Sequence, residues 1–201
     1  MGSYAGDMDA QTHRADARIL SRRTLADDHR RLAEVLRPGL RVLDVGCGVG
    51  AITAGIAEAI GPEGVVVGVD RDVQHLESAR ARYGHLAQLR FEVGEVAELS
   101  YERKFDVVTA ARTLQWVAEP ERAVARMAAA TKVGGLVVVL DYSLAENEWA
   151  PEPPAEFRAF YDAFLQWRAS HGWRNRMAAD SPELFRAAGL VEVESCDQDE
   201  V

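Results

Sequence analysis

The sequence has little of the material that several classes of protein require. Its two cysteines, Cys47 and Cys196, are far apart and lie in no metal-binding spacing, so we expect neither a disulfide framework nor a metal site. No apolar run is long enough to span a bilayer, and no secretory leader is visible. We therefore expect a cytoplasmic protein with reduced thiols and no membrane partner.

Basic charge is also scarce. The chain has 23 Lys and Arg residues against 32 Asp and Glu residues, which gives a formal net charge of −9. Non-specific binding to nucleic acid needs a basic surface, so nucleic acid is not an expected partner. With 201 residues, of which 48% are hydrophobic and 27% charged, the chain has the length and composition of one ordinary globular domain.

One glycine-rich stretch organises the rest of the chain. Residues 41–51 read R-V-L-D-V-G-C-G-V-G-A, a short apolar run interrupted by Asp44 and followed by Gly46, Gly48 and Gly50. The run predicts a buried parallel strand, and the glycines permit positive φ and the close approach of a ligand to the backbone. Residues 51–60 carry isoleucines four apart, which predicts a helix whose N-terminus favours anionic groups.

Strand and helix patterns alternate along the chain. Helices are predicted over 15–37, broken or bent near 21–24, and over 72–83, 120–130, 155–170 and 181–189. Further strands are predicted at 65–69, 89–93, 105–110, 136–140 and 190–195. The strand at 136–140 is apolar throughout, so we expect it to be buried on both faces. The alternation indicates an α/β fold with a Rossmann-like, doubly wound, mainly parallel sheet and helices on both faces.

The ends of the predicted strands carry polar residues that point to one site. Ligands of parallel sheets bind at the carboxyl ends of the strands. A carboxylate after the first strand can meet a cationic amino group, and one after the second can accept both hydroxyls of a ribose. The residues at or just beyond such ends are Asp44, Asp70, Glu95, Ala111 and Asp141.

This pattern resembles the first two motifs of the class I S-adenosylmethionine-dependent methyltransferases, in particular the small-molecule enzymes of types 11 and 25. The motifs are an acid before a Gly-x-Gly turn, here Asp44, Gly46 and Gly48, and an acid that ends the second strand, here Asp70. The stretch A-R-T-L-Q-W-V-A-E-P after the fourth strand continues the resemblance. It implies methyl transfer from S-adenosyl-L-methionine to a small-molecule acceptor, mainly by proximity and orientation, with S-adenosyl-L-homocysteine as the product.

The resemblance also implies roles for individual residues. Glu95 stands where the family has an acid, usually Asp, that receives the adenine amino group, and Trp116 is expected under the methionine arm. The predicted cofactor residues are Asp44, Gly46, Cys47, Gly48, Asp70, Arg71, Gly94, Glu95, Val96, Ala111 and Trp116. The predicted substrate residues are Arg112, Tyr142 and Phe164. The candidate general bases are His171 and Tyr161, followed by His29, which we expect to be a solvated helix histidine.

Two other functions remain open. Gly46, Gly48 and Ala51 fit the G-x-G-x-x-G/A fingerprint of an NAD(P)-binding oxidoreductase, a reading that Asp44 and the stretch after the fourth strand oppose. A non-catalytic methyl-donor-binding protein is favoured by Ala111, where the family often has a polar residue. A nucleic-acid methyltransferase is disfavoured by the charge and by A-A-R-T in place of an N/D-P-P-Y/F tetrapeptide.

The predicted organisation has four parts. They are a helical arm or lid at 1–40, in which Tyr4 is a candidate to cover the cofactor, a cofactor-binding core at 41–143, an aromatic helical substrate lid at 144–180, and the last helix and strand at 181–201. The family usually adds a seventh, antiparallel strand, and no such strand is evident after residue 195. Three explanations stay open: the sheet edge is completed differently, the chain is a truncated version, or a partner chain, such as a second copy in a homodimer, covers an edge that would otherwise favour association.

Overall fold

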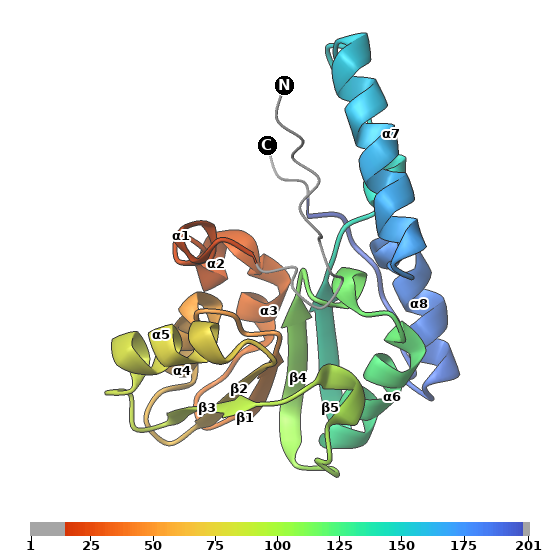
Figure 1. The fold of residues 1–201 in the computed structure, drawn as a ribbon. Helices are drawn as coiled ribbons and strands as arrows, with labels where there is room; N and C mark the ends of the chain where they lie inside the picture. The colour runs from red at the N-terminus through yellow and green to blue at the C-terminus, as the bar shows by residue number, and fades with distance from the viewer. Residues whose placement is uncertain (1–14, 199–201) are drawn as a thin grey trace.

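A computed structural model describes residues 15–198, in which five strands form one parallel sheet (Figure 1). The strands lie in the order β3-β2-β1-β4-β5, and every neighbouring pair is parallel. Their bounds are β1 (Arg41–Val45), β2 (Val65–Asp70), β3 (Leu89–Val93), β4 (Phe105–Ala111) and β5 (Thr131–Leu140). The predicted Rossmann-like α/β fold is confirmed.

Helices cover both faces of this sheet (Figure 1). One face carries α2 (Leu25–Asp28), α3 (Arg30–Val35), α4 (Ala51–Ile60) and α5 (Val73–Tyr83). The other carries η2 (Val96–Glu98), α6 (Pro120–Ala130) and α8 (Met177–Ala187). The remaining elements are α1 (Ala17–Leu20), η3 (Leu114–Trp116), η4 (Leu144–Glu146) and α7 (Ala155–Ser170). Between residues 15 and 198, no helix has the length and apolarity needed to cross a membrane.

Side-chain alternation along the strands builds a core on each face. In β1, Val42 packs with the helices α2 to α5, whereas Leu43 and Val45 pack with η2, α6 and α8. Successive side chains of a strand point to opposite faces, so a strand in the middle of such a sheet must be apolar at nearly every position. Asp44 breaks this rule in β1 although it is only 3% exposed, and a buried carboxylate there calls for a reason beyond folding.

The strand order places a reversal of the chain beside β1. The chain builds β1, β2 and β3 outward on one side and then returns to form β4 on the other side of β1. In open α/β sheets, this reversal opens a crevice at the carboxyl ends of the two strands concerned. The glycine turn after β1 and the segment after β4 therefore lie next to each other at the crevice where a ligand is expected to bind.

The C-terminal part corrects two predictions. Residues 190–195 form no strand, and Glu192 has a φ of +53°, a left-handed value that a strand cannot contain. The last helix begins at Met177, not at Ser181, so the predicted boundary at residue 180 falls inside α8. Contacts distant in sequence set this start, because Ala178 N donates to Tyr142 O and Ala179 N to Ser143 Oγ.

The edge strand β5 corrects a third prediction. It includes residues 131–135, which were expected to close the preceding helix. None of residues 136–140 is fully buried, and Leu136 is 46% exposed. The expectation of burial on both faces was wrong because, among the residues described, β5 has β4 as its sole strand neighbour.

The N-terminal segment forms three short helices, with the predicted break between Leu20 and Leu25 and a second, unpredicted break at His29, which is buried. This residue follows α2 and is 1% exposed, so the prediction of a solvated helix histidine was wrong. Its Nε2 lies 2.9 Å from Thr109 Oγ1 in β4. Thr109 donates its own hydroxyl hydrogen to Val138 O at 2.8 Å, so it accepts a hydrogen bond from His29 Nε2–H.

Burial and the nearby charge of Arg112 lower the pKa of His29 to about 4. The ring is therefore neutral at pH 7 and tethers the N-terminal helices to the centre of the sheet. Such a weakly basic, enclosed ring is a poor general base. Tyr4, the other N-terminal candidate, lies outside the described residues.

The predicted helix at 155–170 is confirmed as α7, which projects beyond the rest of the domain (Figure 1). Its aromatic rings follow one another at centroid distances of 6.2 Å between Phe157 and Tyr161, 6.1 Å between Tyr161 and Phe164, and 6.0 Å between Phe164 and Trp167. Phe160, by contrast, is 66% exposed. The role of this helix as a substrate lid stays a prediction.

We expect Thr109→Val to lower the free energy of unfolding by about 1–3 kcal/mol, because it leaves the buried Nε2–H of His29 without an acceptor. Urea denaturation measures the change. In a His29→Phe/Thr109→Val double variant the orphaned donor is absent, and part of the lost stability should return. A Thr109→Val protein as stable as the wild type would contradict the hydrogen bond.

Candidate functional site

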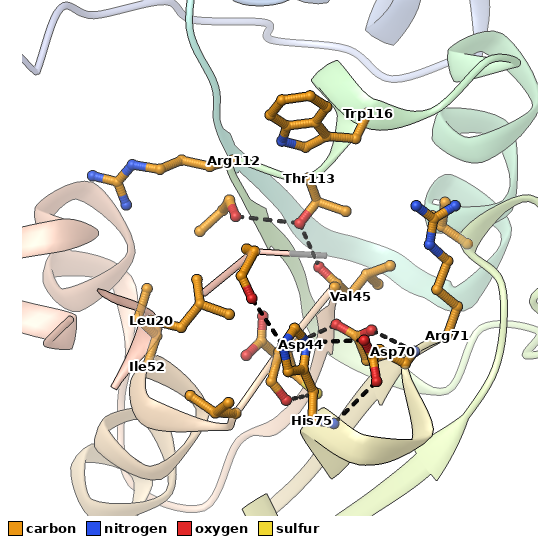
Figure 2. A pocket seen from close by; sticks show the side chains of 18 of the residues that line it. Leu20, Asp44, Val45, Ile52, Asp70, Arg71, His75, Arg112, Thr113 and Trp116 are labelled. Atoms are coloured by element: carbon orange, nitrogen blue, oxygen red, sulfur yellow. Dashed lines mark hydrogen bonds and ion pairs between the residues drawn. The ribbon is translucent and has the colours of Figure 1, made fainter. Parts of the chain in front are cut away.

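A cavity of about 1200 Å³ lies at the carboxyl ends of β1, β2 and β4. Pockets for a single small molecule occupy roughly 300–1000 Å³, so this one has room for a cofactor and an acceptor together. In Figure 2, Asp44 and Asp70 lie on one side of the cavity and Trp116 lies across from them. Within residues 15–198, no cluster of three or more His, Cys, Asp or Glu side chains is placed to hold a metal ion.

The glycine turn after β1 forms the floor of the cavity. Gly46, Gly48 and Gly50 have φ values of +71°, +53° and +77°, so the turn is left-handed at three alternate positions. A Cβ at Gly46 would lie 2.2 Å from Thr113 Oγ1, which means that this position has no space for a side chain. The turn therefore exposes bare backbone to a ligand and leads directly into the N-terminus of α4.

Asp44 contributes a buried carboxylate beside this turn. Its Oδ2 accepts a hydrogen bond from Thr53 Oγ1 at 2.7 Å, which orients the side chain from α4. Burial, opposed by the Thr53 hydrogen bond and assisted by the charge of Asp70, raises the pKa of Asp44 to about 7. A cationic group bound nearby would favour the ionised form and compensate for its burial.

Asp70, at the end of β2, is held by two backbone donors. Its Oδ2 accepts from Gly48 N at 2.7 Å and its Oδ1 accepts from Asp72 N at 2.8 Å. Each carboxylate oxygen has a second lone pair, so both can accept a further hydrogen bond from a ligand. The carboxylate is therefore fixed in orientation before any ligand binds.

The other predicted cofactor residues also line the cavity. Arg71 Nη1 lies 4.0 Å from Glu95 Oε1, and both side chains are more than 40% exposed, so either can turn toward a ligand. Burial raises the pKa of the Cys47 thiol well above its usual value, so this residue is an uncharged wall and not a nucleophile. The remaining predicted cofactor residues on the lining are Gly94, Val96, Ala111 and Trp116.

Comparisons with known proteins agree with this geometry. A family described as "Methyltransferase domain" matches residues 36–173. The chain belongs to the class I S-adenosylmethionine-dependent methyltransferases. Its cofactor is S-adenosyl-L-methionine.

Individual relatives match most of the chain. A trans-aconitate 2-methyltransferase from Deinococcus radiodurans is 32% identical over 78% of this chain and 60% of its own length. A demethylmenaquinone methyltransferase from Staphylococcus aureus is 34% identical over 79% of this chain and 70% of its own. A phosphoethanolamine N-methyltransferase from Haemonchus contortus, solved with S-adenosyl-L-methionine, shares the fold, with a TM-score of 0.68, 21% identity, and coverage of 85% and 37% of the two chains. One further curated relative is covered over only 32% of its length.

The predicted substrate residues all line the cavity, but Arg112 is already engaged. Its Nε donates to the Tyr142 hydroxyl at 2.5 Å, and its Nη2 lies 3.4 Å from Asp28 Oδ1 in α2. In Figure 2 the Arg112 side chain extends away from Thr113 and Trp116. Arg112 also has a φ of +55°, an uncommon value for a residue other than glycine. Phe164 reaches the cavity from α7.

The two candidate general bases are not brought to the site. Tyr161 and His171 are absent from the cavity lining formed by the described residues. The Tyr161 hydroxyl donates to Leu144 O at 2.7 Å, and Nδ1 of His171 lies 2.7 Å from Trp167 O. The Tyr161 hydroxyl thus connects α7 to η4, and the His171 ring packs at the end of α7 itself. This geometry does not support the predicted catalytic role of either residue.

Several site residues escaped the sequence analysis. Thr53 orients Asp44, and Thr113 donates to Val45 O at 3.3 Å while packing against Gly46. A hydroxyl nine residues after an acid is a weak sequence signal, and here it lies in the first turn of α4. Leu20 and His75 also line the cavity, and no sequence motif marks either.

We expect Gly46→Ala to destabilise the domain by more than about 2 kcal/mol, since it adds a clash with Thr113 to the cost of a left-handed alanine. Gly39→Ala is the matched control, because Gly39 has a φ of +81° and no atom within 4 Å of an added Cβ. The control should lose only about 1 kcal/mol. Urea denaturation compares the two, and equal losses would contradict the close approach of Thr113.

Proposed function

We propose that this chain transfers the methyl group of S-adenosyl-L-methionine to a small-molecule acceptor. The observation that carries the proposal is the pair of carboxylates, Asp44 and Asp70, on either side of a left-handed glycine turn in one large cavity. Family membership supports the same activity. The 201 residues span only part of several relatives, so the substrate is proposed from this site and not taken from theirs.

The cofactor would be held by groups whose chemistry matches its parts. Asp44, a buried carboxyl whose pKa is raised to about 7, would face the ammonium group in its ionised form, and Asp70 would accept the ribose hydroxyls. Glu95 and the backbone at Val96 would receive the adenine, and the turn at Gly46 and Gly48 would leave room for the methionine arm. The fit rests on donor and acceptor type at each position.

The acceptor would occupy the part of the cavity lined by Arg112, Tyr142 and Phe164. These residues come from segments after β4 and β5, whereas the cofactor residues come mainly from β1 and β2, so the two sets face each other. A positively charged side chain with a hydroxyl neighbour favours an acceptor that bears a carboxylate. Arg112 would have to share its contacts with Asp28 when such an acceptor binds.

Bound S-adenosyl-L-methionine supplies an electrophilic methyl group on a sulfonium centre. The chain then contributes by holding the acceptor in line with this methyl group and by excluding water. Such positioning can provide most of the rate enhancement of methyl transfer. An ionised carboxylate acceptor has no proton to lose and needs no general base. This agrees with the position of Tyr161 and His171 outside the described cavity lining. No described residue needs to form a covalent bond.

We expect isothermal titration calorimetry to give micromolar binding of S-adenosyl-L-homocysteine and none of NADH or NADPH. Asp70→Ala should weaken binding about 10- to 100-fold, because it removes hydrogen bonds to a charged acceptor. Glu77→Ala, at an exposed position of α5, is the control and should bind normally. Binding of a nicotinamide cofactor instead would overturn the proposal in favour of an oxidoreductase.

Turnover separates an enzyme from a non-catalytic methyl-donor-binding protein. We would incubate the protein with S-adenosyl-L-methionine and a panel of small carboxylic acids, trans-aconitate among them, together with demethylmenaquinone analogues. Acceptor-dependent release of S-adenosyl-L-homocysteine supports methyl transfer. Tight binding without release for any acceptor would favour the non-catalytic alternative.

We expect Asp44→Asn to raise stability while it weakens cofactor binding. Folding raises the pKa of Asp44 from 3.8 to about 7. The folded protein therefore loses stability as the pH increases from 3.8 to about 7, because the buried carboxyl must then ionise. At pH 8 the variant should therefore gain about 1–3 kcal/mol in the absence of ligand, and the gain should shrink toward pH 5. Its affinity for S-adenosyl-L-homocysteine should fall about tenfold.

Thermal melts from pH 5 to pH 8 and calorimetry measure these two effects. Asp162→Asn, an exposed carboxylate on α7, is the control and should change neither quantity. A stability gain that does not depend on pH, or an unchanged affinity, would contradict the role given to Asp44.

A second copy of the chain is a further proposed partner. The open edge of β5 supports it, since Val133 is 86% and Leu136 is 46% exposed there. Light scattering coupled to size-exclusion chromatography tests this association. A monomer at micromolar concentration would exclude a stable dimer.

A further inference from the structure

Arg168 of α7 holds a buried positive charge that the proposed reaction does not use directly. It is 0% exposed and is the largest fully buried side chain. Its Nε donates to Asn175 Oδ1 at 2.9 Å and its Nη2 to Gln115 O at 2.8 Å, while its Nη1 has no hydrogen-bond partner. A buried guanidinium is rarely better for stability than an apolar side chain of similar volume, so its presence asks for another reason.

Asp141, just beyond β5, is a partly buried carboxyl group that contacts η3, the same element that Arg168 contacts at Gln115 O. Its Oδ2 accepts from Leu114 N at 2.9 Å, and its Oδ1 has no hydrogen-bond partner. Burial raises its pKa to about 7 against the opposing effect of the Gln115 and Leu114 backbone and of the charges on Arg168 and Arg112. The carboxylate thus meets the N–H end of η3, and the guanidinium meets a carbonyl within it.

The element held in this way carries part of the cavity wall. Gln115 and Trp116 of η3 line the cavity, whereas Arg168 is not among the described residues that do. Arg168 Cζ lies 4.2 Å from the centroid of the Trp116 ring, a close cation–π contact, and Trp173 meets the same ring edge-on at 5.1 Å. The orientation of Trp116 is therefore set by groups that do not line the cavity.

We propose that Arg168 is a positioning residue that, together with Asp141, holds Trp116 in the wall of the cofactor cavity. The proposal rests on the proposed function, because it takes this cavity to be the S-adenosyl-L-methionine site. It also gives α7 a second task. Since the hydrogen bond to Gln115 O ties α7 to η3, a displacement of this helix changes the cofactor wall as well as the acceptor side.

The first measurement is calorimetric titration with S-adenosyl-L-homocysteine. Arg168→Met, which keeps the length and removes the charge and the donors, should weaken binding roughly tenfold. Arg168→Lys keeps the charge and loses the planar fork, so its loss should be smaller, roughly threefold. Asp141→Asn keeps an acceptor for Leu114 N but removes the negative charge near Arg168, so it should weaken binding as well. This variant tests the proposal if an Arg168 variant fails to fold.

A double-mutant cycle separates positioning from general destabilisation. In a Trp116→Leu background, Arg168→Met should change the affinity less than twofold, because the side chain it positions is gone. Phe105→Leu is the structural control. Phe105 is fully buried at the amino end of β4, away from the cavity, so its truncation should lower thermal stability and leave affinity unchanged.

The near-ultraviolet circular dichroism spectrum reads Trp116 without any ligand. Arg168→Met should alter this spectrum clearly in the wild-type background and much less in the Trp116→Leu background, where the contacts of Arg168 with Trp173 and Phe164 are the ones that still change. An equal loss of affinity in both backgrounds, or no loss at all, overturns the inference. Absence of S-adenosyl-L-homocysteine binding by the wild type would instead overturn the proposed function, and the spectra would still decide whether Arg168 fixes Trp116.

Discussion

One carbonyl group, Val69 O at the end of β2, holds the site together. It accepts hydrogen bonds from Gly46 N at 2.7 Å and from Cys47 N at 3.1 Å, so the turn that leaves β1 is fastened to the neighbouring strand. The side chain of the next residue, Asp70, adds a third bond from the same turn by accepting from Gly48 N. These three bonds lock the ends of two parallel strands into one rigid edge. The left-handed glycines are needed because the backbone must bend sharply enough to present successive N–H groups in this way.

Charge is buried on both sides of the cavity, and its cost is met by specific partners on each side. Asp44 has Thr53 and Asp141 has the backbone of η3, while Arg168 has Asn175 and a main-chain carbonyl. Folding alone does not favour such groups, because a well-packed apolar residue would usually serve it as well. Asp44 lines the cavity itself, whereas Asp141 and Arg168 lie behind the lining and fix η3, which forms part of the wall. Such preorganisation reduces the reorganisation that accompanies binding.

The parts of the structure that could be predicted from the sequence are those decided by local pattern. The first turn and its acids, Asp44 and Asp70, follow from strand, glycine and helix signals that lie within 30 residues of one another. The parts that could not be predicted depend on contacts between distant residues. The start of α8 is set by groups after β5, the burial of His29 depends on Thr109, and the end of the sheet depends on the left-handed Glu192. That Tyr161 and His171 lie outside the described cavity lining could not be predicted either, because the direction of α7 relative to the crevice has no signature in its own residues.

The position of β1 in the sheet has a consequence for how the chain is made. Val42 of β1 pairs with Val107 of β4, 65 positions later, while its other edge pairs with β2 much nearer in sequence. On a ribosome, the half that contains β1, β2 and β3 emerges first, and β1 waits with one edge unpaired until β4 has been synthesised. Closing so long a loop costs entropy before any contact compensates for it, which makes this pairing a slow step. The crevice that binds the ligand is therefore assembled late, and it is the last junction of two halves that form at different times.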